Sequence, residues 1–283
     1  MADGPQNNRI GFIIQARMKS TRLPGKILYP LPFYPDGKPV LHWIIYALKR
    51  SKQIGIIILA TTVESEDDVL TAFANQQNVI LHRGSENDVL RRFAEAVQIS
   101  LLDTIVRITG DNPILPISEI DELVIRHIEN KNDYTCSENL PLGMNIEIIK
   151  GSVITAINSI EDLTLHDREH VTPYIKRSKS LQKEFVPLCE EKLTEKMRLT
   201  IDYPADYAAL NLVMQHSLQS GLTGLALVNY INKTAPWVWQ INNEKHQVQQ
   251  YSNQNEEVTA AIKQLNSLGF FHAASILENA KQK

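Results

Sequence analysis

The sequence predicts an α/β protein built on a doubly wound, mostly parallel sheet. Short apolar runs such as 10–15 and 104–109 are long enough for buried strands and too short for helices. Longer stretches between such runs, for example 117–130, carry apolar residues at helical spacing. Apolar strands that alternate with amphipathic helices are typical of a parallel sheet covered by helices on both faces.

The first 130 residues are predicted to form alternating strands and helices. Ser65 with Asp68 is expected to form a capping box at the start of one helix. Pro24 and Gly25 break the chain within 16–26, which predicts a loop there. The predicted strands span 10–15, 54–62, 79–82 and 104–109, and the predicted helices span 40–52, 65–77, 88–101 and 117–130.

Beyond residue 133 the alternation changes. Pro204 suits the first turn of a helix, where its missing N–H costs little, and Gly221 ends that helix. The tail, 255–283, is predicted to form two helices broken at Gly269, a hairpin that could pack on the sheet, on a second subunit or on a partner. The other predicted elements are a strand at 145–149, helices at 152–160, 168–178, 204–219 and 226–233, and extended segments at 184–187 and 198–201.

The composition of the 283 residues excludes several classes of protein. A formal net charge of −3 speaks against a general nucleic-acid coat, which carries a basic face. Two cysteines, Cys136 and Cys189, offer neither a disulfide scaffold nor a metal-binding cysteine cluster. No apolar run reaches the length of a membrane span, and the polar start at 1–8 lacks a signal core, so the expected compartment is the cytoplasm.

A dense group of cations follows the first predicted strand. In an open α/β sheet, ligands bind outside the carboxyl ends of the strands, where loops offer free N–H groups. Fixed cations beside such groups make a cradle for a polyphosphate, although a solvated basic loop is the alternative. Five cations lie in the first 35 residues, opposed there only by Asp3, and they are Arg9, Arg17, Lys19, Arg22 and Lys26.

Two aspartates end apolar strands elsewhere. Asp111 follows the predicted strand that carries Arg107, and a carboxylate there can hold Mg²⁺ against phosphate oxygens, although Asp-Asn-Pro is also a common turn. Asp202 ends a short apolar segment, with Asp206 one turn further on, and it can equally be the N-cap of the next helix. A cationic loop with two such carboxylates is suited to nucleotide transfer, which needs positioning and charge stabilisation.

Six motifs in the same order, within about 9–220, give a family resemblance. IIQARMKSTRLPGKIL at 13–28 resembles the signature of the cytidylyltransferases that activate acidic sugars, the CMP-Kdo and CMP-sialic acid synthetases. The whole set is most similar to the spore coat polysaccharide biosynthesis protein F branch of that group. The other five motifs are GSENDVLRRF at 84–93, RITGDNPILP at 107–116, GMNIEII at 143–149, REHVTPYI at 168–175 and RLTIDYPADY at 198–207.

The resemblance implies a fold, a reaction and a nucleotide site. The fold would be the Rossmann-like one of nucleotide-diphospho-sugar transferases. The reaction would be Mg²⁺-dependent transfer of CMP from CTP to a 2-keto sugar acid, with release of pyrophosphate, for a surface glycan. Asp111 and Asp202 match the paired Mg²⁺ ligands of the family. Arg17 and Lys26 match the triphosphate-binding positions, Ser20 and Arg22 belong to the same loop, and Arg83, Gly84, Asp88 and Gly110 are the further expected nucleotide contacts.

The resemblance also implies regions for the acceptor and for dimer formation. Residues 133–195 correspond to the family's acceptor-binding and dimer-forming region, within a nucleotidyltransferase domain at 1–220. Residues 221–283 would be a C-terminal helical extension. The polar candidates for acceptor binding are Glu147, Glu169 and His170. Glu147 could equally be a satisfied structural residue, Glu169 a helix-start carboxylate favoured by the dipole, and His170 a helix-surface histidine.

Three functions fit these observations. The first is the cytidylyltransferase, a homodimer that binds CTP and a small acidic sugar and needs neither nucleic acid nor a membrane. The second is a glycosyltransferase of similar topology that uses a nucleotide sugar, although the dense cationic loop suits a triphosphate better. The third is a non-catalytic scaffold that works through the C-terminal helices.

Overall fold

The computed structural model describes residues 8–34, 37–53, 55–189, 197–242, 254–267 and 271–281. The chain divides into two compact units, Met1–Asn243 and Glu244–Lys283. This structural division, after residue 243, lies C-terminal to the functional boundary predicted after residue 220. The functional boundary stays a prediction.

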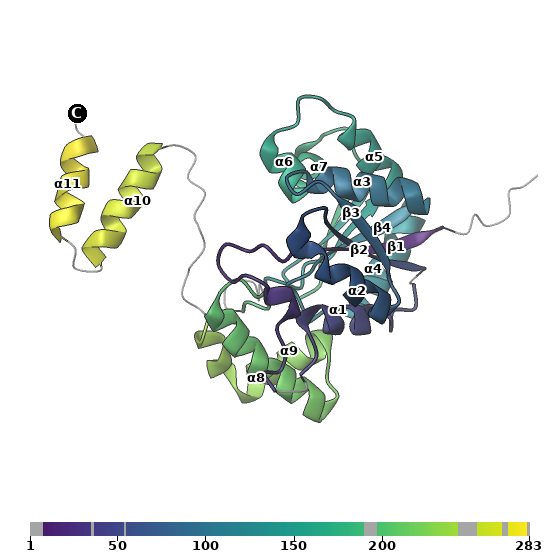
Figure 1. The fold of residues 1–283 in the computed structure, drawn as a ribbon, viewed down its shortest axis with the longest axis horizontal. Coiled ribbons are helices and arrows are strands. Elements are labelled where there is room, and N and C mark those ends of the chain that lie inside the picture. The colour runs from purple at the N-terminus through teal and green to yellow at the C-terminus, as the bar shows by residue number, and fades with distance from the viewer. Residues whose placement is uncertain are drawn as a thin grey trace, which may run out of the picture. The chain divides into compact units, whose positions relative to one another are not determined.

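The first unit is built on a seven-stranded sheet of order β3-β2-β1-β4-β6-β5-β7. Figure 1 labels four of these strands, β1 to β4, among the helices that surround them. Strand β6 is antiparallel to both of its neighbours, and every other neighbouring pair is parallel. The predicted mostly parallel α/β sheet is therefore confirmed. The strands are β1 (Ile10–Gln15), β2 (Ile56–Thr62), β3 (Ile80–Gly84), β4 (Thr104–Thr109), β5 (Tyr134–Glu138), β6 (Glu147–Lys150) and β7 (Lys183–Pro187).

Helices cover both faces of this sheet. Alternate residues of a strand point to opposite faces, so Phe12 and Ile14 join one apolar cluster and Ile13 joins the other. Helices α1, α2, α4, α8 and α9 contribute to the first cluster, and α3, α5 and α7 to the second. The helices of this unit are α1 (Val40–Leu48), α2 (Val69–Gln77), α3 (Val89–Ser100), α4 (Ile117–Glu129), α5 (Gly151–Asn158), α6 (Leu165–His170), α7 (Pro173–Arg177), α8 (Pro204–Ser220) and α9 (Gly224–Thr234).

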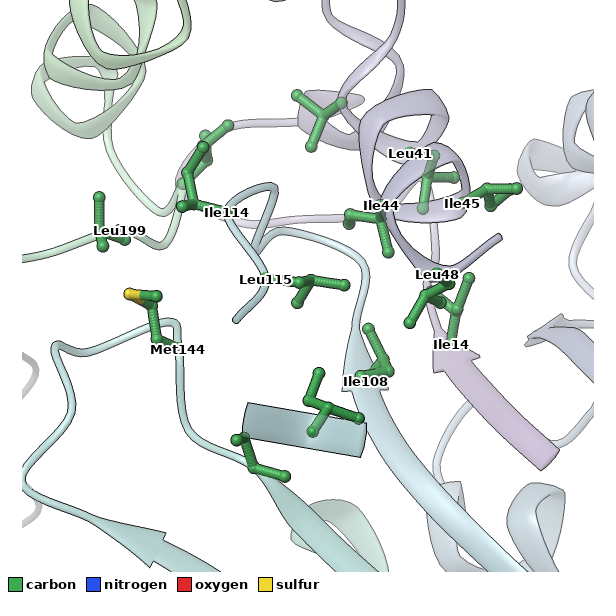
Figure 2. Packing of buried hydrophobic residues seen from close by; sticks show 14 of the residues in the cluster. Ile14, Leu41, Ile44, Ile45, Leu48, Ile108, Ile114, Leu115, Met144 and Leu199 are labelled. Carbon is green, nitrogen blue, oxygen red and sulfur yellow. The ribbon is translucent and has the colours of Figure 1, made fainter. Parts of the chain in front are cut away.

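The first cluster reaches the loops that follow the strands (Figure 2). Ile14 and Ile108, from β1 and β4, pack with residues of α1 in the same buried cluster. Met144 and Leu199, from two loops of the second half, belong to that cluster as well, each at most 1% exposed. The core of the sheet thus anchors loop segments that are far apart in the sequence.

The predicted capping box at Ser65 and Asp68 is wrong. Ser65–Asp67 is a short 3-10 helix, η2, and α2 begins only at Val69 with no side-chain hydrogen bond at its cap. Asp68 pairs instead with Arg83, at 2.7 Å. The neighbouring Asp67 accepts hydrogen bonds from the buried hydroxyl groups of Thr61 and Thr62 at the end of β2. The tertiary partners of the two carboxylates therefore override the local capping motif.

Other departures lie in the second half of the first unit. The predicted helix at 168–178 is two helices, because the chain turns at Val171 (φ 67°) and Pro173 begins α7. Strand β5 was not predicted, since YTCSE has few aliphatic residues. The extended segment at 198–201 forms only an isolated bridge, between Arg198 and Leu142.

The second unit contains α10 (Gln254–Ser267) and α11 (Phe271–Lys281), which pack against each other. Two tail helices are therefore confirmed. The predicted break at Gly269 lies outside the described residues, as do Ile54, the first residue of one predicted strand, and the segment 1–7. Within the described part of the chain, no helix has the length and apolarity to cross a membrane.

Candidate active site

The carboxyl ends of β1 and β4 lie side by side. The N–H of Gly110 donates to the carbonyl of Gln15 at 2.8 Å, which continues the parallel pairing one residue past β4. A Cβ at Gly110 would lie 2.7 Å from the Cβ of Ala16, so glycine permits this close approach. The loops that leave both strands therefore start together at one edge of the sheet.

The loop after β1 folds back and buries its last cation. Gly25, in the left-handed conformation (φ 72°), donates to the carbonyl of Met18 at 2.9 Å. The N–H of Met18 donates to the carboxylate of Asp67 at 2.6 Å, which fastens the loop to the end of β2. Lys26 follows this turn in the short 3-10 helix Lys26–Leu28 and is only 8% exposed.

Lys26 brings the two predicted aspartates together. Its Nζ donates to Asp111 Oδ2 at 2.7 Å and to Asp202 Oδ1 at 3.0 Å. Both carboxylates thus face the same position, which the ammonium group of Lys26 occupies. An ammonium buried in this way is stable because it is paired with charge and hydrogen bonded.

Backbone hydrogen bonds hold Asp202 at this edge of the sheet. The N–H of Ile201 donates to the carbonyl of Asp111 at 3.0 Å, and the N–H of Leu199 donates to the carbonyl of Leu142 at 2.7 Å. The latter contact needs Gly143, whose φ is 98° and whose missing Cβ would lie 2.5 Å from the carbonyl carbon of Leu199.

Asp206 supports Asp202 from behind. It is 1% exposed, and its Oδ2 accepts hydrogen bonds from the N–H groups of Asp202 and Tyr203, each at 3.0 Å. Its Oδ1 accepts from Arg198 Nε at 3.0 Å and Asn242 Nδ2 at 3.1 Å. Helix α8 is capped at Tyr203, so the alternative that Asp202 is its N-cap is wrong.

Asn242, which the sequence did not predict, supports the site by donating to Asp206. It follows the short 3-10 helix Pro236–Gln240, is 3% exposed, and also donates to the carbonyl of Arg198 at 3.0 Å. Nothing in the local sequence marks it, since a lone asparagine after an apolar segment is common.

The remaining loop cations divide between two sets of partners. Arg22 lies over the ring of Tyr203, 4.9 Å from its centroid, and its Nη2 is 3.5 Å from Asp202 Oδ1. Arg17 and Lys19 instead face Glu86, at 3.6 and 3.1 Å. Ser20 is half-buried in the same loop. The structure thus joins Lys26, Arg22, Asp111 and Asp202 in one network, and ties Arg17 to the loop after β3.

Arg83 and Asp88 both have protein partners. The guanidinium of Arg83 donates to the carbonyls of Thr62 and Glu64, at 2.8 and 2.9 Å, besides its ion pair with Asp68. Asp88 caps α3 by accepting from the N–H of Arg91, at 2.9 Å, and it also accepts from Arg168 Nη1, at 2.9 Å. Gly84, the last residue of β3, is buried.

Glu147 is buried in the centre of the second half of the sheet. It accepts hydrogen bonds from Arg107 Nη1 (2.6 Å) and the hydroxyl of Tyr134 (2.6 Å), and it pairs with Lys176 Nζ (2.8 Å). The break between α6 and α7 also brings the Thr172 hydroxyl to it, at 2.9 Å. Burial raises the pKa of Glu147, but Arg107 and Lys176 outweigh burial and lower it to about 2.

Glu169 and His170 lie at the end of α6, and both are exposed. The ring of His170 is 4.5 Å from that of His166. Although the residue is largely exposed, desolvation of its ring lowers the pKa of His170, and the charge of Glu169 opposes this shift only in part. Of the three predicted acceptor residues, Glu147 is thus buried and the other two are exposed.

The donor set at Asp111 and Asp202 fits a magnesium ion. Mg²⁺ takes oxygen ligands, and proteins hold it through one or two carboxylates that leave room for water and substrate phosphates. The two carboxylates converge on one position, where Lys26 Nζ supplies positive charge. Among the described residues, no group of three or more His, Cys, Asp or Glu side chains is arranged for a metal ion.

Two cavities occur elsewhere in the first unit. The larger, about 730 Å³, is lined by residues of α1, α4, α8 and α9, among them Trp43, Ile125 and Leu218. The second, about 630 Å³, is lined by residues that include Leu101 and Lys150. Neither of these two cavities is lined by Lys26, Asp111 or Asp202.

Comparison with known proteins gives one consistent result. A family model described as cytidylyltransferase matches residues 11–222. The spore coat polysaccharide biosynthesis protein SpsF of Bacillus subtilis (strain 168) is 35% identical over 213 residues, which cover 74% of this chain and 87% of that protein.

Two solved structures extend the comparison. A cytidylyltransferase from Leptospira borgpetersenii is 32% identical, with a TM-score of 0.75, and the match covers 82% of this chain and 97% of that one. The CMP:2-keto-3-deoxy-manno-octonic acid synthetase complexed with CTP has a TM-score of 0.58 over 74% of this chain and 100% of its own, at 13% identity, and so supports the fold alone.

Proposed function

The chain belongs to the cytidylyltransferase family, and on that premise we propose that it transfers CMP from CTP to a hydroxyl of an acidic sugar, with release of pyrophosphate. The acceptor would be a 2-keto sugar acid, such as a nonulosonic or Kdo-like acid, destined for a surface glycan. The similar protein of Bacillus subtilis is named for polysaccharide biosynthesis, which supports the last point.

One observation carries the proposal. Lys26 Nζ lies within 3.0 Å of both Asp111 and Asp202, at the edge of the sheet where β1 and β4 end. Ligands of open α/β sheets bind outside the carboxyl ends of the strands. A buried ammonium beside two carboxylates at this edge provides both signs of charge that a triphosphate and its counter-ion need.

The proposed reaction is an in-line displacement at the α-phosphorus of CTP. The oxygen of the acceptor hydroxyl forms a new bond to that phosphorus, and its proton passes to solvent water. The bond from the α-phosphorus to the bridging oxygen of the β-phosphate breaks, and pyrophosphate leaves with the electron pair. Lys26 and Arg22 would hold the phosphates in line, with Arg17 and Ser20 on the same loop.

Asp111 and Asp202 would hold Mg²⁺, whose contribution when bound is to neutralise phosphate charge. This network contains three carboxylates, those of Asp111, Asp202 and Asp206. It also contains three cations, Lys26, Arg22 and Arg198, so its charges balance without a metal ion. Lys26, which pairs with both carboxylates here, would contact phosphate oxygens when Asp111 and Asp202 hold Mg²⁺.

We base the proposed binding of the sugar acid on the charged residues around Glu147 of β6. Glu147 positions Arg107 and Lys176, and cations there would attract the carboxylate of a sugar acid. Glu169 and His170, both exposed on α6, would contact its hydroxyl groups. We also propose that residues 133–195 form the contact of a homodimer, as the family resemblance implies.

The test uses the full chain with CTP, Mg²⁺ and a panel of 2-keto sugar acids. We expect calorimetry to detect Mg²⁺-dependent CTP binding, and pyrophosphate release with at least one acid. UDP-sugars should compete poorly with CTP. Absence of CTP binding, or silence across a broad panel, would contradict the proposal.

A further inference from the structure

Helix α6 carries two histidines one turn apart on its exposed side. His166 and His170 are both exposed, and the centroids of their rings lie 4.5 Å apart. Residues at i and i+4 of a helix are neighbours on one face. Imidazole is a good ligand for Zn²⁺, Cu²⁺ and Ni²⁺, whereas Mg²⁺ prefers oxygen. The pair is therefore a candidate site for a transition-metal ion.

The spacing of the two rings fits one ion bound to both. Zn²⁺ binds histidine nitrogens at about 2 Å, which places it roughly 3 Å from the centre of each ring. Two rings on one ion, at a bond angle of about 90–110°, then have centres about 4.5–5 Å apart. The distance of 4.5 Å between His166 and His170 lies in this range.

The tilt between the rings also allows a shared ion. A metal ion lies in the plane of each imidazole that binds it, so two parallel stacked rings cannot share one. The planes of His166 and His170 differ by 59°. The rings of His216 and Tyr230, also 4.5 Å apart, are a stacked pair instead, with planes that differ by 12°. The contact on α6 is thus not a face-to-face stack.

The inward side of α6 holds the backbone of the two histidines in place. Asp167 is fully buried, forms a capping box with Thr164, and pairs with Arg177 through both carboxylate oxygens. Arg168 pairs with Asp88 at 2.9 Å. Metal ligands bind best when the surrounding structure fixes them. The buried partners of α6 provide that support while leaving its outer face free.

The charges beside the pair are compatible with a cation. Glu169 is exposed between the two histidines, and its negative charge acts on His170. The positive charge of Arg107 also acts on His170, but this guanidinium is paired with Glu147 at 2.6 Å. The resulting order, H-x-x-E-H at 166–170, is one with which a class of metalloproteases binds zinc on a helix.

Two histidines leave part of the coordination sphere of the ion open. Over the part of the chain that the structure describes, no three His, Cys, Asp or Glu side chains are grouped for a metal ion. Structural zinc sites are closed by four protein ligands, whereas sites with fewer keep positions for water or substrate. An ion held by this pair would therefore exchange with solvent and would not be needed for folding.

We propose that His166 and His170 bind a transition-metal ion such as Zn²⁺, apart from the proposed Mg²⁺ ligands Asp111 and Asp202, and that this ion inhibits the enzyme. The inhibition rests on the proposed function, in which His170 contacts the sugar acid. An ion on His170 occupies the nitrogen that would serve the acceptor. Zn²⁺ therefore raises the KM for the acid and leaves the affinity for CTP unchanged.

The binding test uses the full chain without nucleotide, in excess Mg²⁺ so that carboxylate sites are filled. Calorimetry measures the Zn²⁺ affinity of wild type, His166→Gln and His170→Gln. Each change should weaken the strongest Zn²⁺ site by more than about tenfold, because losing a ligand costs at least as much as losing a group that supports one. His272→Gln, on an exposed residue of α11, should leave it unchanged. Equal affinities in all four proteins would overturn the proposal.

Electron paramagnetic resonance with Cu²⁺ shows whether both rings bind the same ion. Wild type should give the splitting pattern of two bound imidazole nitrogens, and each single variant the pattern of one. This measurement on wild type needs no substitution, so it holds even if a variant disturbs α6. The pattern of a single nitrogen in wild type would mean that the rings do not converge, and the shared site would be wrong.

The inhibition test measures pyrophosphate release against the concentration of the acid, with and without Zn²⁺. His166→Gln keeps His170 for the acceptor, so it should match wild type without Zn²⁺ yet need at least about tenfold more Zn²⁺ for the same inhibition. Equal inhibition of the two proteins would overturn the inhibitory role. A chain that binds Zn²⁺ through both histidines but releases no pyrophosphate with any acid would contradict the proposed function and the inhibition, while the metal site would stand.

Discussion

Lys26 and Asp202 are 176 positions apart in the sequence, yet the Nζ of one lies 3.0 Å from the Oδ1 of the other. The pair joins the loop after the first strand to the start of α8. Asp111, after the fourth strand, completes the group at 2.7 Å from the same Nζ. Three segments thus depend on one another at a single position, and each can be tested separately.

Asp111→Asn and Asp202→Asn should each reduce turnover by about 100-fold or more, because a neutral amide oxygen holds the cation more weakly than a charged carboxylate. Both variants should fold, since the substitution preserves shape. Pyrophosphate release measures turnover, and titration with Mn²⁺ followed by electron paramagnetic resonance measures metal binding. Asp162→Asn, on an exposed residue, is the matched control. Unchanged Mn²⁺ affinity in either variant would remove that residue from the metal site.

Lys26→Ala should weaken CTP binding by about tenfold to hundredfold, the usual effect of losing a charged hydrogen bond. The melting temperature should also fall, because Asp111 and Asp202 lose the cation that separates them. Calorimetry and thermal melting check both effects. Lys233→Ala, which removes an exposed lysine of α9, should change neither. Wild-type affinity in Lys26→Ala would show that the loop is not the phosphate cradle.

Gly143→Ala should destabilise the protein by about 3 kcal/mol and displace Asp202 as well. The new Cβ would lie 2.5 Å from the backbone of Leu199, and the chain there has a φ of 98°. Gly221→Ala is the control, because its φ is 73° but no atom lies within 4 Å of the new Cβ. It should cost only about 1 kcal/mol, the penalty of the left-handed conformation. Equal losses in urea unfolding would show that the close approach contributes nothing.

Glu147→Gln should remove a pH-dependent part of the stability. The folded-state pKa of Glu147 is about 2, against an ordinary value of 4.5, so the unfolded chain binds the proton more tightly. The carboxylate therefore stabilises the fold above pH 4.5, by about 3 kcal/mol, and this contribution disappears as the pH falls towards 2.

Urea unfolding of wild type and Glu147→Gln across this range measures the effect. The two free energies of unfolding should differ most near neutral pH and converge in acid. Glu129→Gln, on an exposed residue of α4, should run parallel to wild type at every pH. A constant difference between wild type and Glu147→Gln would mean that its carboxylate does not titrate below its ordinary pKa in the folded protein.

The sequence by itself determined the alternation of strands and helices in the first 130 residues. Both faces of those strands are buried, so their apolar runs and the helical spacing between them are visible in any short window. Lys26, Asp111 and Asp202 were also predicted from the sequence, because each lies in the segment that follows an apolar run, and the family resemblance then gave them roles. Strand β5 and the break at Val171 escaped prediction, since tertiary partners rather than local pattern determine them.

Only the tertiary structure decided which charged residues have partners. It showed that Arg83 is engaged, whereas Nε and Nη1 of the buried Arg92 have no hydrogen-bond partner among the residues that the structure describes. It also placed Asn242 behind Asp206, 36 residues away. The physical reason is the distance along the chain over which each signal acts. Periodicity and motifs depend on residues that are neighbours in the sequence. Ion pairing and burial depend on segments that meet only when the sheet assembles.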